Sequence, residues 1–222
     1  MPKLHNVLKR SYAKKDEQKK GFHEDGDDYD YDEGLSNHNQ QVYYDKKKKK
    51  LLVSVAGTHN LSDVGTDLYL AAGHLKDTNR FKEAENVLNK AKVKYGVDSA
   101  TVVGHSLGGS VSQYIAGSKD KAYTLDKGAT IGQKTRSNEN AYRTSGDAVS
   151  LLNANSTRMT TIAKPKPKPK TWIGTIASAV VSTPKAIIEK GLNTATGGLY
   201  GVAKGALEAH DVDNIKDESI FV

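Results

Sequence analysis

The pattern that most constrains this fold is a run of β-branched residues followed at once by a glycine-bracketed serine. Residues 100–103 read Ala-Thr-Val-Val, which predicts a buried strand of a parallel sheet. Residues 104–109, here called the elbow, read G-H-S-L-G-G, and residues with helical spacing follow them. The pattern predicts a strand that turns sharply into a helix, with Gly104 and Gly108 letting that helix pack close to the strand.

Such a turn is a setting in which a serine becomes a nucleophile. It presents the Ser106 hydroxyl to a substrate, and the helix that begins there directs N–H groups and its positive dipole end at a developing oxyanion. The amide of Leu107 is the expected first oxyanion donor. Thr58, which with Gly57 ends an earlier apolar run, is the expected second. The alternatives are a glycine-rich structural turn at the elbow and a simple strand end at Thr58.

Charge is distributed unevenly along the 222 residues, whose net charge is +7. Residues 1–40 join a lysine-rich start to an acidic block at 24–33, so we expect a disordered charged tail that could fold back on a basic surface. A calcium site in that block is disfavoured, because it lacks the full loop spacing. The positive charge is clustered lysine, which predicts no specific nucleic-acid partner but leaves salt-sensitive polyanion binding as an alternative.

Cysteine is absent, which excludes a disulfide scaffold and a thiolate metal site. No metal or organic cofactor is expected. The first five residues lack the apolar core of a secretory signal, and no run approaches the roughly 20 apolar residues that span a bilayer. The expected location is the cytoplasm or the periphery of an intracellular membrane.

Residues 41–163 are predicted to form one α/β domain, a compact and mostly parallel sheet flanked by helices. Residues 46–50 are five lysines that fit a hairpin turn, or alternatively a nuclear-localisation or nucleic-acid patch. Gly96 is the expected end of a helix that precedes the elbow strand. The expected strands cover 41–45, 51–58, 100–103, 122–125, 140–144 and 158–163, and the expected helices cover 60–70, 78–95 and the residues after the elbow.

Beyond this core the composition changes twice. Residues 164–170 alternate lysine and proline, which predicts an extended spacer of roughly 20 Å. Residues 171–205 begin with an amphipathic stretch, so that 171–190 could contact a membrane, close over an apolar site as a lid, or pack on the core. Residues 206–222 are the C-terminal segment expected to complete the active site.

The remaining members of a catalytic set follow from chain order. Asp147 comes after the second predicted strand beyond the serine, and this selects it over Asp126 as the acid. His210 is the candidate base, so that Ser106, Asp147 and His210 follow the serine, acid, histidine order of α/β-hydrolases. The alternatives are that Asp147 caps a turn and that His210 is an exposed histidine in a mobile tail.

Three blocks of sequence resemble the class 3 lipase family, the fungal-lipase-like α/β-hydrolases. They are residues 53–67, the G-H-S-L-G-G elbow, and residues 142–149, with the segment around His210 similar to the family's terminal histidine segment. The resemblance implies hydrolysis of carboxylic esters, often acylglycerols or phospholipids, with the Thr58 and Leu107 amides as oxyanion donors. Two features depart from the family: the core is short, and the Lys-Pro spacer precedes the histidine.

The overall layout also resembles proteins of large DNA viruses and their satellites, which adds the virion as a location. The alternative from another class is a non-catalytic, membrane-associated scaffold with a lipase-like fold. Its support is the basic charge together with the amphipathic stretch at 171–190. Against it, all three catalytic residue types occur in the right order.

Overall fold

A single mixed sheet organises the protein. The computed structural model describes residues 2–24, 26–58, 75–128, 134–144, 147, 159–163, 212, 220 and 222. Within them, seven strands lie side by side in chain order: β1 (Tyr29–Tyr31), β2 (Gln40–Asp45), β3 (Lys50–Val55), β4 (Thr101–His105), β5 (Lys121–Leu125), β6 (Glu139–Thr144) and β7 (Met159–Ala163). The helical elements of these ranges are α1 (Leu4–Tyr12), α2 (Lys15–Gln18), the 3-10 turn η1 (Leu75–Asp77), α4 (Asn79–Tyr95) and α5 (Leu107–Ile115).

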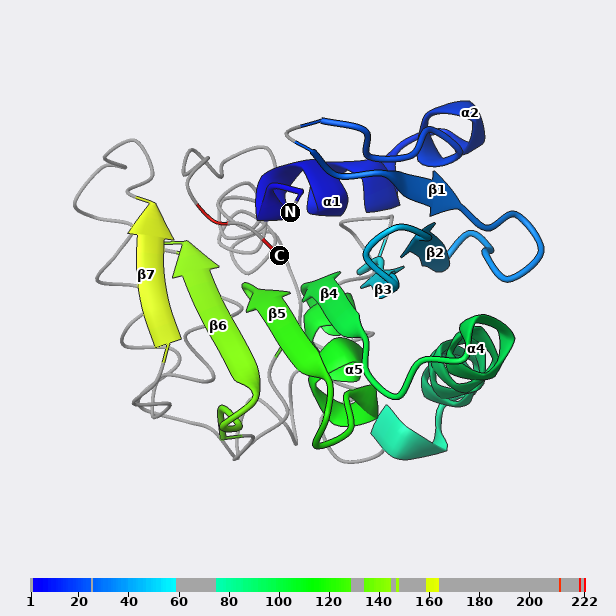
Figure 1. Ribbon diagram of the computed structural model, residues 1–222. Helices are drawn as coiled ribbons and strands as arrows, with labels where there is room; N and C mark the ends of the chain where they lie inside the picture. Colours follow the sequence, from blue (N-terminus) through cyan, green and yellow to red (C-terminus); the bar gives the residue numbers. More distant parts are fainter. Residues whose placement is uncertain are drawn as a thin grey trace, which may run out of the picture.

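The sheet changes from antiparallel to parallel at β3. Strands β1, β2 and β3 pair antiparallel, whereas each neighbouring pair from β3 to β7 is parallel. Figure 1 shows the strands fanning from the blue and cyan edge to the yellow β7. The prediction of an α/β fold with a mostly parallel sheet and flanking helices is confirmed at this level.

The lysine run forms the predicted hairpin. Strands β2 and β3 pair from Gln40 opposite Val55 to Asp45 opposite Lys50, and residues 46–49 make the turn between them. The more apolar strand β3 lies between β2 and β4, as its composition predicted.

A parallel crossover then leads to the elbow. Helix α4 begins after Thr78, whose hydroxyl accepts the Phe81 N–H, and it ends at Gly96 in the left-handed conformation at φ 60°, ψ 40°. Strand β4 follows and pairs parallel with β3, so the predicted strand, helix, strand order is confirmed. The helix buries the expected apolar face against the sheet: Phe81, Ala84, Val87, Leu88 and Ala91.

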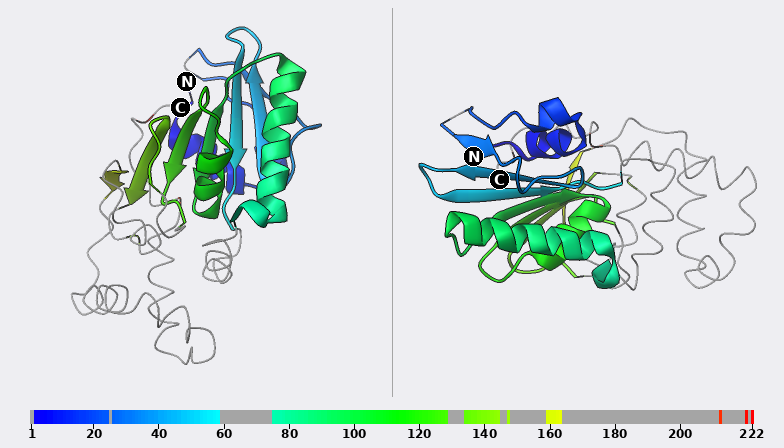
Figure 2. Two further views of the ribbon diagram at one scale, coloured as in Figure 1. Left: turned by 90° about the horizontal axis from the view of Figure 1, so that it is seen from below. Right: turned by 90° about the vertical axis from the view of Figure 1, so that its right-hand side faces the viewer.

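Apolar side chains pack on both faces of the sheet. One core cluster joins α4 and α5 to residues such as Val53 and Val102, and a second joins α1 to residues such as Leu52 and Val103. Neighbouring strand residues point to opposite faces, which explains how adjacent positions serve different clusters. Figure 2 shows α1 on one side of the sheet and α4 with α5 on the other.

The expectation that residues 1–40 form a disordered tail is wrong. Leu4, Val7, Leu8 and Ser11 recur at helical spacing on α1, and all four are buried. The N-terminal region also meets the C-terminal residues, since the Leu4 N–H donates to the Ile220 carbonyl and the Val222 N–H to the Pro2 carbonyl. The helical spacing of the apolar residues is therefore a better guide to order here than the high charge of the segment. One buried apolar stripe is enough to pack the helix on the sheet.

The acidic block is ordered as well. The carboxylates of Asp27, Asp28 and Asp30 lie 2.9, 2.8 and 3.6 Å from the ammonium groups of Lys48, Lys47 and Lys46, and Tyr29 between them is buried in β1. The block thus folds back on the lysine hairpin. Because these three lysines face carboxylates, they form a poorer polyanion-binding patch than the sequence alone suggested.

Several predicted segments lie outside the described residues. They are the helix over 60–70, the spacer at 164–170, the amphipathic segment at 171–205, and most of 206–222. Val212 and Val222 are described, and both are buried in the cluster that contains α1. In the described part of the chain, no helix combines the length and the apolar character needed to cross a bilayer.

Candidate active site

Ser106 occupies a strained turn between β4 and α5. Its backbone lies at φ 58° and ψ −131°, in the region that favours glycine, directly before the first residue of α5. Its N–H donates to the Leu125 carbonyl at 3.1 Å, and its carbonyl accepts the N–H groups of Gly109 at 3.0 Å and Gly128 at 2.9 Å. These bonds to β5 and to α5 hold the serine in a conformation that it would otherwise avoid.

The elbow glycines allow the close packing that the sequence predicted. A Cβ on Gly104 would lie 2.3 Å from the Gly108 carbonyl oxygen, and one on Gly108 would lie 2.2 Å from the Val55 oxygen. Both distances are far below an ordinary contact. Helix α5 therefore begins against the end of β3 and directly over β4, a position that side chains at 104 and 108 would prevent.

The Ser106 hydroxyl is enclosed. The residue is 2% exposed, and within the described residues its Oγ has no hydrogen-bond partner. Leu107 is the first residue of α5, so its N–H has no acceptor within the helix and is directed at the space before the helix. A buried hydroxyl without a hydrogen-bond partner costs free energy.

The loop after β3, residues Gly57 and Thr58, lies beside the serine. A Cβ on Gly57 would be 2.9 Å from the Ser106 Cβ and 2.8 Å from the His105 carbonyl oxygen. This glycine is needed because a side chain would collide with the elbow. Thr58, the predicted second donor, is the next residue in the chain and is partly exposed.

Both candidate acids are buried near the ends of their strands. Asp126, at the end of β5, accepts the Thr144 N–H at 2.6 Å and the Thr144 hydroxyl at 2.7 Å, so it ties β5 to β6. Asp147 follows β6, is 1% exposed, and donates its N–H to the Thr144 carbonyl at 3.1 Å. The strands carrying Ser106 and these aspartates are parallel, which places all three at one edge of the sheet.

His210 lies outside the described residues, so its role as base stays a prediction. Val212, two residues along the chain, is buried in the cluster that also contains Leu125, whose carbonyl accepts the Ser106 N–H. The structure thus brings together the elbow, the Gly57–Thr58 loop and the strand ends before the two aspartates.

Two residues of this site were missed from the sequence. The Tyr12 hydroxyl on α1 accepts the Gly57 N–H at 2.8 Å and lies 2.8 Å from Nδ1 of His105. Arg80 on α4 donates from Nη2 to the carbonyls of Ala56 at 2.5 Å and Gly57 at 2.7 Å. The apolar spacing of α1 could have revealed Tyr12, since it places that helix on the sheet. Arg80 has no comparable signal, because an arginine in a first helical turn usually faces solvent.

A buried ion pair supports the elbow from behind. The Lys127 ammonium lies 2.7 Å from Oε1 of Glu139, with both side chains fully buried, and Glu139 also accepts from Gln113 and Thr124. Burial lowers the pKa of Lys127, and the attraction of Glu139 opposes that shift. The Lys127 Cβ would be 2.9 Å from a Cβ on Gly109, so this network is packed directly against the first turn of α5.

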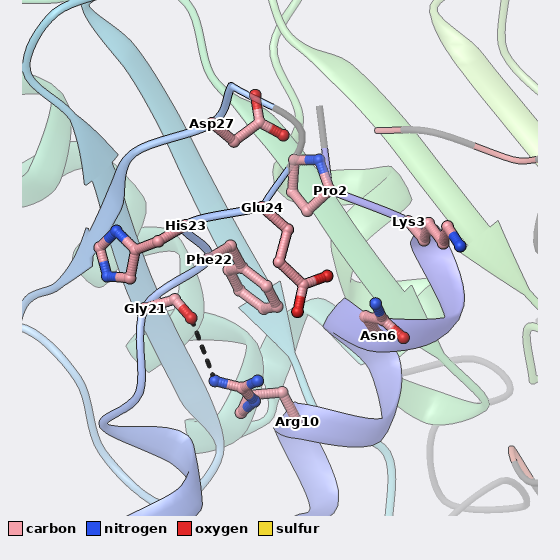
Figure 3. A pocket seen from close by; sticks show the side chains of 9 residues that line it. All are labelled: Pro2, Lys3, Asn6, Arg10, Gly21, Phe22, His23, Glu24 and Asp27. Atoms are coloured by element: carbon pink, nitrogen blue, oxygen red, sulfur yellow. Dashed lines mark hydrogen bonds between the residues drawn. The ribbon is translucent and has the colours of Figure 1, made fainter.

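A small hollow of about 40 Å³ lies elsewhere, between α1 and the segment before β1. Figure 3 shows its polar lining, with Arg10 donating to the Gly21 carbonyl and Glu24 facing the helix. The residues that line it are Pro2, Lys3, Asn6, Arg10, Gly21, Phe22, His23, Glu24 and Asp27. None of them is a predicted site residue, so this hollow is separate from the elbow.

The comparisons with known proteins add little to this geometry. Among solved structures, the native lipase propeptide complex of Rhizomucor miehei shares 13% identity, with 67% of this chain and 61% of that chain covered and a TM-score of 0.45. The chain therefore spans about three fifths of the length of that structure. No protein-family model and no curated protein matches the chain. A likeness this weak carries no argument about the fold or the function, so the site rests on its own geometry.

Proposed function

We propose that this protein is a serine hydrolase that cleaves carboxylic esters. The observation that carries the proposal is the backbone of Ser106 at φ 58°, ψ −131°, held between β4 and the N-terminus of α5 by hydrogen bonds on both sides. That conformation costs free energy, but it places the hydroxyl where helix N–H groups can stabilise an oxyanion. A purely structural turn would be more stable with glycine at this position.

The proposed mechanism is acyl transfer through a covalent intermediate. His210 removes the proton of Ser106 as its oxygen attacks the ester carbonyl, and Asp147 orients the imidazole and stabilises its charged form. The amides of Thr58 and Leu107 donate to the tetrahedral oxyanion, each worth on the order of 3 kcal/mol in the transition state. The alcohol leaves with the proton from His210, and water then attacks the acyl-enzyme to release the acid.

Lipids are the proposed substrate class, as acylglycerols or phospholipids. The support is the resemblance of three sequence blocks to class 3 lipases and the amphipathic segment at 171–190, which would contact a membrane or cover an apolar site. Hydrolysis of p-nitrophenyl esters of graded chain length, with and without residues 164–205, tests this. Loss of long-chain hydrolysis on deletion is expected, and unchanged long-chain hydrolysis would contradict the role given to the segment.

A fluorophosphonate probe tests the serine directly. The expected result is covalent labelling of the native protein that disappears in Ser106→Ala and falls steeply in His210→Asn and Asp147→Asn. If the folded native protein is not labelled, the non-catalytic scaffold becomes the better description. Labelling that persists in Ser106→Ala would place the nucleophile elsewhere.

A further inference from the structure

The peptide backbone at Gly57 is held from both faces of the sheet. On the α1 face, the Tyr12 hydroxyl accepts the Gly57 N–H at 2.8 Å. On the α4 face, Arg80 donates to the Gly57 carbonyl at 2.7 Å and to the Ala56 carbonyl at 2.5 Å. Figure 2 shows the two helices on opposite sides of the sheet. Both polar groups of one residue are therefore fixed by side chains from distant parts of the chain.

The direction of the Thr58 amide follows from this arrangement. The Gly57 carbonyl and the Thr58 N–H belong to one planar trans peptide, so they point in opposite directions. A guanidinium that holds the carbonyl on one side must turn the N–H to the other. A charged donor on the carbonyl oxygen also polarises the peptide, which makes its N–H a stronger donor.

The Tyr12 contact sets the position of the same loop relative to the elbow. Its hydroxyl oxygen is shared between the Gly57 N–H and Nδ1 of His105, the residue directly before the serine. A Cβ on Gly57 would lie 2.2 Å from that hydroxyl, so the tyrosine occupies the space that the glycine leaves open. One side chain thus connects the loop that carries Thr58 to the strand that carries Ser106.

We infer that Arg80 and Tyr12 are positioning residues that fix the Thr58 amide as an oxyanion donor. The inference rests on the proposed hydrolase function and deepens it. Neither side chain is required to touch the substrate. Arg80 orients and polarises the Gly57–Thr58 peptide, and Tyr12 holds that peptide at a fixed distance from the elbow. The oxyanion hole is therefore built by α1 and α4 as much as by the elbow.

The arginine is tested with a matched pair of variants in the full chain. Arg136 is the control, because its Nη1 also donates to two carbonyls, those of Gln113 and Ala116 at 2.8 Å each, at the far end of α5. With p-nitrophenyl butyrate, Arg80→Met should lower kcat by about 10-fold to 100-fold, below the full loss of an oxyanion donor, and leave KM within about threefold. Arg80→Lys should recover part of the loss, since an ammonium can bond one carbonyl. Arg136→Met should leave kcat unchanged.

The tyrosine has its own control. Tyr43→Phe removes another hydroxyl that packs against the N-terminal region, since Tyr43 donates to the Gln18 carbonyl at 3.1 Å. Tyr12→Phe should lower kcat by about 3-fold to 10-fold, as a misplaced donor loses part of its effect, whereas Tyr43→Phe should not. Thermal unfolding of every variant establishes that it is folded at the assay temperature.

The outcomes separate this inference from the function on which it rests. A native protein without Ser106-dependent hydrolysis overturns both. An active native protein whose folded Arg80→Met and Tyr12→Phe variants keep their kcat overturns this inference alone. Equal losses in Arg80→Met and Arg136→Met would also overturn it, because they would show a general structural effect. A loss confined to kcat in the Arg80 and Tyr12 variants supports it.

Discussion

Replacing Gly108 with alanine would force a methyl group into the backbone at the end of β3. The new Cβ would lie 2.2 Å from the Val55 carbonyl oxygen and 2.5 Å from that of Ala56, whereas ordinary contact begins at 3.4 Å. Neither neighbour is a flexible side chain, so the first turn of α5 must move by about 1.2 Å, the difference between 3.4 and 2.2 Å. We expect Gly108→Ala to lower the free energy of unfolding by about 1 to 3 kcal/mol, the usual cost of overpacking.

The same movement carries Ser106 and Leu107 away from the Gly57–Thr58 loop. A displacement of about 1 Å in a catalytic group can cost about 100-fold in rate, so fluorophosphonate labelling should slow by that order. Urea unfolding and labelling kinetics measure the two effects separately. The matched control is Gly34→Ala, whose Cβ would lie 3.5 Å from Oδ1 of Asp32, an ordinary contact. A Gly108→Ala protein that unfolds and reacts like the native chain would refute the reasoning.

Three further predictions concern stability. Leu8→Ala, at a residue with 0% exposure, should cost about 2 to 5 kcal/mol in urea unfolding. Glu139→Gln should cost about 3 to 5 kcal/mol because it removes the carboxylate charge that faces the buried Lys127 ammonium, and adding Lys127→Met should recover part of that loss. Asp32 is buried, which raises its pKa, but hydrogen bonds from Lys94 and Tyr95 outweigh this and hold the pKa below its ordinary value. Asp32 therefore stabilises the fold at neutral pH and loses this effect as the pH falls through its lowered pKa, so Asp32→Asn should flatten the acid limb of the stability curve and cost about 2 kcal/mol at pH 7.

Each of these predictions has a control or a contrary result. Val93→Ala, at a side chain with 83% exposure, should leave stability unchanged. If Leu8→Ala also left stability unchanged, α1 would not be packed on the sheet. A double variant at Lys127 and Glu139 whose loss equals the sum of the single losses would show that the pair is not coupled. Asp98→Asn, at an exposed carboxylate beside Lys119, should change stability at pH 7 by no more than about 0.5 kcal/mol.

The sequence predicted those parts of the fold in which local pattern and tertiary position agree. The elbow, the lysine hairpin and the helix ending at Gly96 each combine a periodic run with a distinctive turn or cap. The N-terminal helix was missed because its charge was given more weight than the spacing of Leu4, Val7 and Leu8. The charged composition shows that most side chains of this segment favour water. Packing of the helix on the sheet requires only one apolar stripe.

Site residues that are neighbours in the chain could be predicted from the sequence, whereas those brought together from distant parts of the chain could not. Ser106 and its glycines share one motif, but Tyr12 lies 45 residues from Gly57 and 93 from His105. Arg80 acts on carbonyl groups, and a carbonyl gives no sequence signal because every residue has one. The choice of Asp147 over Asp126 and the role of His210 stay predictions. The Asp126 carboxylate accepts two hydrogen bonds from Thr144, which gives it a structural role of its own.

The backbone of Ser106 has a consequence for how this chain can change over generations. Because a residue without a side chain would occupy φ 58°, ψ −131° with less strain, drift toward greater robustness alone would favour glycine at this position. Keeping serine there lowers the stability of the fold and provides a reactive hydroxyl. Any lineage of this protein released from the need for that hydroxyl would have a ready, single-residue route to a sturdier fold.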